Sequence, residues 1–69
     1  MSNKLKQVRR MKMLSMSELA RKSGISRQTI HKLERGAEQS YTMRTLMKIA
    51  HALDTPVTEI FDVDITDIS

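Results

Sequence analysis

Basic and amide side chains gather between Arg27 and Arg35, in a segment whose spacing predicts a helix. A wheel of about 100° per residue that points Ile30 and Leu33 into a core leaves polar side chains on the opposite side and its flanks: Arg27, Gln28, Thr29, His31, Lys32 and Arg35. Gln can pair with adenine through two hydrogen bonds, and Arg or Lys can donate to guanine, each worth about 1–3 kcal/mol of base discrimination. This face therefore carries groups suited to base edges and phosphates; the alternative interpretation is a merely solvated surface.

The segment before this helix predicts how it is positioned. Ser15 and Glu18 have the S-x-x-E spacing of a capping box, which starts a helix. Gly24 predicts the end of that helix, because a stop favours a residue that reaches positive φ without a Cβ penalty. Ile25 then fills the turn, and Ser26 can cap the second helix. Two short amphipathic helices joined by a tight turn are the expected result.

Taken with its neighbours, this unit resembles the lambda repressor and Cro type of helix-turn-helix regulators of bacteria and phages. The resemblance covers about residues 5–61 and rests on these anchors: Leu14-Ser15, Glu18-Leu19-Ala20, Gly24-Ile25-Ser26, Thr29-Ile30, Leu33-Glu34-Arg35-Gly36, Leu46, Ile49-Ala50, Leu53 and Ile60-Phe61. It implies an all-α fold, a compact five-helix DNA-binding domain over residues 1–61. The sequence itself adds a short acidic C-terminal tail, 62–69. The resemblance also implies a sequence-specific regulator, a repressor that binds an inverted repeat of double-stranded DNA as a homodimer with its third helix in the major groove.

By position in the family motif, three residues would read bases: Arg27, Gln28 and Lys32. The resemblance places a second group near the DNA backbone: Ser15, Met16, Ser17, Ser26, Thr29, His31, Arg35, Ser40 and Arg44. Phosphate contacts of this kind fit the preference of anions for the free N–H groups at a helix N-terminus.

The chain departs from the family pattern at three places. Met16 stands where a phosphate-binding Gln is frequent, and Met13 stands where the first helix usually ends in Gly. The loop 37–41 has Tyr41 in place of the usual Pro, and its Glu38 is expected to repel a phosphate. We therefore expect this loop to approach DNA less closely than in relatives.

The family pairing of Arg9 with Glu34 implies an ion pair between the first and third helices. On the wheel, Glu34 lies beside Ile30 on the inner flank, so a buried Glu34 would require a partner. The alternative is a solvated carboxylate on a basic surface.

Composition agrees with a polyanion partner. The 69 residues predict one small domain. Residues 1–53 hold all 12 lysines and arginines with three acids, a charge of +9, whereas residues 54–69 hold five acids, a charge of −5. We favour duplex DNA over a membrane surface, because the cations do not oppose an apolar face bearing Trp or Phe. We also favour it over RNA, because single-strand readers usually stack bases on several aromatic side chains and Tyr41 and Phe61 are the only aromatic residues. The absence of cysteine and of a signal-like segment predicts a cytoplasmic location.

The remaining elements are predicted from apolar spacing. A first helix over residues 4–13 would bury Leu5, Val8 and either Met11 or the Lys12 stem. Thr42 would cap a fourth helix that runs through Leu53, with this apolar side: Met43, Leu46, Met47, Ile49, Ala50 and Leu53. Pro56 would start a last short helix, from which Val57, Ile60 and Phe61 close the core.

The tail alternates apolar and acidic residues, a period-2 pattern that would form a strand against a partner. The candidates for dimerisation are Phe61, Val63, Ile65 and Ile68. The alternative is a frayed acidic terminus with no specific role.

Catalytic and metal-binding functions find little support. The two histidines, His31 and His51, lie far apart with no cysteine or serine triad nearby, and Met11, Met43 and Met47 have the spacing of core residues. We expect no catalytic residue, metal, cofactor or small-molecule ligand. The competing function is a protein-interaction module, such as an antitoxin or accessory subunit, which the acidic tail favours.

Overall fold

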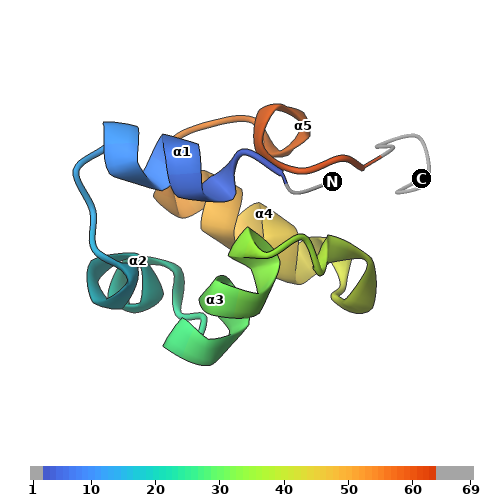
Figure 1. The fold of residues 1–69 in the computed structure, drawn as a ribbon, viewed down its shortest axis with the longest axis horizontal. Coiled ribbons are helices and arrows are strands. Elements are labelled where there is room, and N and C mark those ends of the chain that lie inside the picture. The colour runs from blue at the N-terminus through green and yellow to red at the C-terminus, as the bar shows by residue number, and fades with distance from the viewer. Residues whose placement is uncertain (1–2, 64–69) are drawn as a thin grey trace.

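A computed structural model describes residues 3–63 as five α-helices and one 3-10 turn (Figure 1). In chain order these elements are α1 (Leu5–Met11), α2 (Met16–Ser23), α3 (Arg27–Glu34), the 3-10 turn η1 (Glu38–Ser40), α4 (Met43–Ala52) and α5 (Val57–Ile60). No strand occurs among these described residues. The expected all-α, five-helix fold is confirmed. The predicted strand of the tail, with Ile65 and Ile68, lies outside the described residues.

Helix α4 lies at the centre of the arrangement, with α1 and α5 on one side of it and α2 and α3 on the other (Figure 1). Its contacts with α2 and with α5 connect the two sides, and α1 also reaches α3. The helices are short, so most of their stability must come from packing of their apolar faces rather than from helix propensity.

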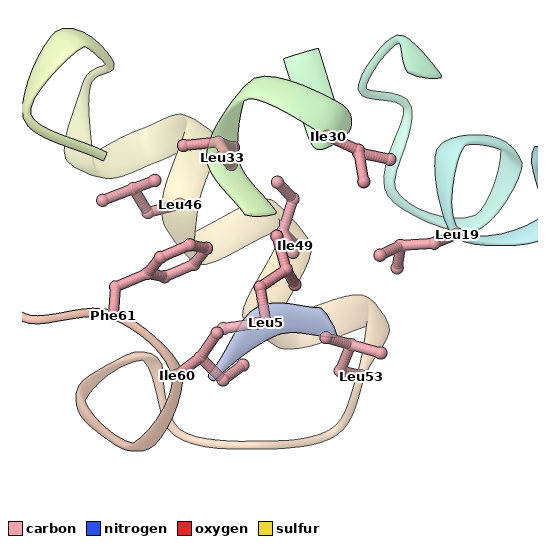
Figure 2. Close-up of a cluster of buried hydrophobic side chains, with 10 residues drawn as sticks. Leu5, Leu19, Ile30, Leu33, Leu46, Ile49, Leu53, Ile60 and Phe61 are labelled. Atoms are coloured by element: carbon pink, nitrogen blue, oxygen red, sulfur yellow. The ribbon is translucent and has the colours of Figure 1, made fainter. Parts of the chain in front are cut away.

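The core is an apolar cluster to which every helix contributes (Figure 2). Its buried members are Leu5, Leu19, Ile30, Leu33, Leu46, Ile49, Ala50, Leu53, Ile60 and Phe61. Val8, Ala20, Ile25, Met43 and Val57 pack against it while partly buried. Figure 2 shows Ile30 and Leu33 of α3 directed at this cluster. Gln28 and Lys32 on the other side of α3 are exposed.

Local signals set the helix starts as predicted. Ser15 accepts a hydrogen bond from the Glu18 N–H at 3.0 Å, and the Glu18 carboxylate accepts from the Ser15 N–H at 2.8 Å, so the capping box is complete. Ser26 and Thr42 cap α3 and α4 through the N–H groups of Thr29 and Thr45. These helix starts therefore follow from the sequence alone.

Glycines end α2 and α3. Gly24, at φ 75°, follows α2, and its N–H donates to the Ala20 carbonyl. Gly36, at φ 97°, follows α3 in a Schellman arrangement, in which its N–H donates to the Leu33 carbonyl and the Ala37 N–H donates to the Lys32 carbonyl. Both turns require a conformation that side chains with a Cβ disfavour.

Two expectations about methionine are wrong. Met11 is 72% exposed and Met47 is 48% exposed. Met11 is six residues after Leu5 and so points well away from the inner side of α1, where Arg9 takes the buried position one turn after Leu5. Met47 lies about 100° from its buried neighbour Leu46. The Lys12 stem is not buried either, because α1 ends at Met11 and Lys12 is exposed.

Small differences occur at three helix ends. The first helix is shorter than predicted, and Met13 after it takes the left-handed conformation at φ 60°. The fourth helix ends at Ala52, with Leu53 as its C-cap. Pro56 is the N-cap of α5, with an extended ψ of 140°, rather than its first helical residue.

Candidate nucleic-acid interface

The outer side of α3 presents the three predicted base-reading side chains to solvent. Arg27, Gln28 and Lys32 are all exposed, whereas Ile30 and Leu33 on the same helix are fully buried. His31 and Arg35 are exposed on the same helix and at its C-cap. The structure thus brings cations and an amide together on one short helix whose orientation is fixed by its buried side.

Hydroxyl groups at the start of α3 have defined hydrogen-bonding states. The Ser26 hydroxyl donates to the Thr29 hydroxyl at 3.0 Å and accepts from the Thr29 N–H at 3.2 Å. Because the single hydroxyl proton of Ser26 is used inside the protein, Thr29 keeps the proton that can be donated to a phosphate. Of these two predicted backbone contacts, Thr29 is the better donor.

The start of α2 offers backbone N–H groups rather than a Gln side chain. Met16 is half-buried and packs against the core, so its side chain does not stand at the surface as a phosphate ligand. The N–H groups of Met16 and Ser17 precede any intrahelical acceptor and are the donors left at this end. Ser15 and Ser17 are exposed beside them.

The capping box changes the acidity of the carboxylate at this helix start. Hydrogen bonds from the backbone and then the hydroxyl of Ser15 lower the pKa of Glu18. Glu18 therefore remains ionised at neutral pH, and its negative charge lies close to the N–H groups that would meet a phosphate.

The connection from α3 to α4 brings two further predicted contacts to the surface. Ser40 at the end of η1 and Arg44 in the first turn of α4 are both exposed. Glu38, by contrast, is only 5% exposed and points inward. The carboxylate of Glu38 therefore does not stand at the surface of this loop, because it accepts hydrogen bonds inside the protein, from the Asn3 amide and from the Asp62 N–H.

An ion pair attaches the inner flank of α3 to α1. Arg9 Nε donates to Glu34 Oε2 at 2.5 Å, and Arg9 Nη2 lies 3.5 Å from Glu34 Oε1. The two side chains are only 9% and 5% exposed. Arg9 Nη1 also donates to the Leu14 carbonyl at 2.7 Å, so one guanidinium joins α1, the turn after it and α3.

Other candidate residues lie away from this surface. Phe61 is buried in the core and Val63 packs partly against it, so neither forms a free apolar patch. Among residues 3–63, no three His, Cys, Asp or Glu side chains are grouped closely enough to hold a metal ion. None of the helices in that range is long and apolar enough to cross a membrane.

Comparison with known proteins agrees with this geometry. The model of a family described as "Helix-turn-helix" matches residues 5–60, and the chain belongs to that family. It is 34% identical over 56 residues to the HTH-type transcriptional regulator SlrR of Bacillus subtilis. The matched region is 81% of this chain but only 37% of that relative, so the similarity concerns one part of the longer protein.

Proposed function

We propose that this chain is a sequence-specific DNA-binding transcriptional regulator that places α3 in the major groove. The observation that carries the proposal is the exposed trio Arg27, Gln28 and Lys32 on a helix-turn-helix whose other side is buried. The major groove admits an α-helix and displays a distinct donor and acceptor pattern for each base pair. The family membership and the resemblance to a transcriptional regulator support the same function.

Each group at the interface has a physical role in this mechanism. Gln28 suits adenine, and Arg27 and Lys32 suit guanine. The N–H groups at the start of α2 and the side chains of Thr29, Ser40 and Arg44 suit phosphates, which fix orientation without reading sequence. The phosphate contacts supply affinity that falls with salt, whereas the contacts of α3 supply the choice of site.

Selection of binding sites from a randomised duplex library at physiological salt tests the proposal, because phosphate attraction is weakened there. Enrichment of a defined sequence is the expected result, and failure to enrich any sequence would refute sequence reading by this chain. Lys32→Ala should relax preference at one base position, while Lys48→Ala, which removes an exposed lysine from α4, should not. Equal losses on all DNA sequences would show that Lys32 contacts only phosphate.

We further propose a homodimeric repressor that binds an inverted repeat, with two α3 helices about 34 Å apart in successive major grooves. An operator covered in this way is closed to other proteins. Sedimentation equilibrium of the full chain and of a form without residues 62–69 tests the dimer and the contribution of the tail. A dimer that survives the deletion would exclude the tail as its interface.

A further inference from the structure

Glu38 is a buried carboxylate that the interface itself does not use. It lies in η1, between α3 and α4, with 5% of its surface exposed. Burial of an ionised group is costly unless hydrogen bonds replace its water. The one salt bridge among residues 3–63 is that of Arg9 with Glu34, so Glu38 is held by uncharged donors. Oε1 accepts from Asn3 Nδ2 at 2.9 Å, and Oε2 accepts from the Asp62 N–H at 3.4 Å.

The side-chain amide of Asn3 is hydrogen-bonded through its oxygen and both of its N–H groups. Its Oδ1 accepts from the Leu5 N–H at 3.0 Å, at the start of α1. Its Nδ2 donates one proton to Glu38 and the other to the Leu33 carbonyl, at 2.7 Å, in the last turn of α3. An amide with both protons and its oxygen engaged has a single orientation. Asn3 and Glu38 therefore join three segments: the start of α1, the end of α3 and η1.

The residues next to Asn3 and Glu38 in the sequence are also held in place or lie at the candidate interface. The Lys4 N–H donates to the Ile60 carbonyl at 2.9 Å, which ties the residue after Asn3 to α5. On the other side, Glu38 comes two residues before Ser40 and six before Arg44, the candidate phosphate contacts of this connection. The Leu33 carbonyl that Asn3 binds follows directly after Lys32. The contacts around Glu38 thus fix the end of α3 and the loop that follows it.

We propose that Glu38 is a positioning residue for DNA binding: held by Asn3, its buried carboxylate fixes the α3–α4 connection so that Ser40 and Arg44 meet phosphates when α3 enters the groove. The inference rests on the proposed function. A connection that is already ordered does not lose backbone freedom on binding, and that loss would weaken affinity several-fold per residue. The Glu38 carboxylate thus strengthens DNA binding in spite of its negative charge, because it points inward and its hydrogen bonds keep the connection ordered.

The sign of one substitution separates this role from ordinary electrostatics. Glu38→Gln removes a negative charge, which by itself should tighten DNA binding. The amide, however, must turn an N–H group toward either Asn3 Nδ2 or the Asp62 N–H, so one hydrogen bond is lost. We expect the Kd for the selected site to rise about tenfold. The matched control is Glu59→Gln, the same change at an exposed glutamate of α5, which should leave the Kd unchanged or lower it.

Ethylation interference identifies the individual phosphates that the protein contacts. A general loss of stability would weaken binding without changing which phosphates are contacted. In Glu38→Gln, interference should be lost at the phosphates met by Ser40 and Arg44, while base preference under α3 stays the same. Binding is measured well below the melting temperature, with folding checked by circular dichroism. If Glu38→Gln does not fold, Asn3→Ala, which changes no charge, should show the same raised Kd and the same lost phosphates.

The outcomes distinguish this proposal from the function beneath it. If the unmodified chain selects no DNA sequence, the proposed function fails. If the unmodified chain binds its site and Glu38→Gln binds as tightly as Glu59→Gln or more tightly, with all phosphate contacts kept, the positioning role of Glu38 is refuted and sequence reading stands.

Discussion

Replacing Arg9 with alanine should destabilise this fold strongly. The guanidinium makes contacts to two separate segments, the Glu34 carboxylate of α3 and the Leu14 carbonyl after α1. Alanine supplies no donor to either acceptor. Because the Glu34 side chain is only 5% exposed, water cannot readily replace the lost partner. Arg9→Ala therefore leaves a nearly buried carboxylate without its counter-ion.

Breaking a buried ion pair by removing one partner costs about 3–5 kcal/mol. A chain of 69 residues is expected to have a total stability of about 3–10 kcal/mol. The loss is thus a large share of the whole, and it corresponds to a fall in melting temperature on the order of 20 °C for a domain of this size. An exposed pair would be worth only about 0–1 kcal/mol.

Urea denaturation followed by circular dichroism measures the loss directly. Arg10→Ala is the matched control, because it removes an exposed arginine from the same helix and should change stability by less than about 0.5 kcal/mol. The double variant Arg9→Met with Glu34→Leu should recover most of the stability, since neither charge is then left alone. A loss below about 1 kcal/mol in Arg9→Ala would refute the reasoning, because the pair would then behave as a solvated one.

Further predictions concern the turns, the capping box and α3. Met13→Gly should stabilise the fold by about 0.5–1 kcal/mol, because Met13 is 87% exposed and holds φ at 60°; an unchanged urea midpoint would count against strain there. Gly24→Ala should cost about 1 kcal/mol through its φ of 75° alone, since no heavy atom lies within 4 Å of the added Cβ. The Ser15 hydrogen bonds lower the folded-state pKa of Glu18, so the stability they add is present at neutral pH and is lost as pH falls through that pKa. The melting temperature of the unmodified chain should therefore exceed that of Glu18→Gln by less in acid than at neutral pH. A difference that stays constant with pH would contradict this. Gln28→Ala should lose preference at one base position in a site selection and keep its melting temperature, whereas loss of preference at every position would oppose direct readout.

The starts and stops of the helices were predictable because they depend on neighbours in the sequence. The Ser15–Glu18 box, the Ser26 and Thr42 caps and the Gly24 stop each satisfy backbone groups within a few residues. The alternation of polar and apolar residues on α3 likewise predicted which side is buried, because one helical period suffices to define a face. These local signals also carried the resemblance to the helix-turn-helix family.

The side chains that were misassigned depend on neighbours far away in the sequence. Apolar type predicts that Met11 and Met47 are buried, yet the core is filled without them and both side chains are exposed. The position of Glu38 in a loop predicts a surface charge, whereas the structure buries its side chain. Its true partners, Asn3 and Asp62, lie 35 and 24 residues away, and no local pattern reports them.

The sequence by itself determined the class of fold, the helix boundaries to within a few residues and the polar face of α3, since periodicity and capping are properties of short segments. Only the tertiary structure decided that Glu38 is buried and which residues hold the two ends of the α3–α4 connection. Burial of a carboxylate is set by the sum of all segments that surround it, and in this chain those segments meet only when α1, α3 and α5 have packed together.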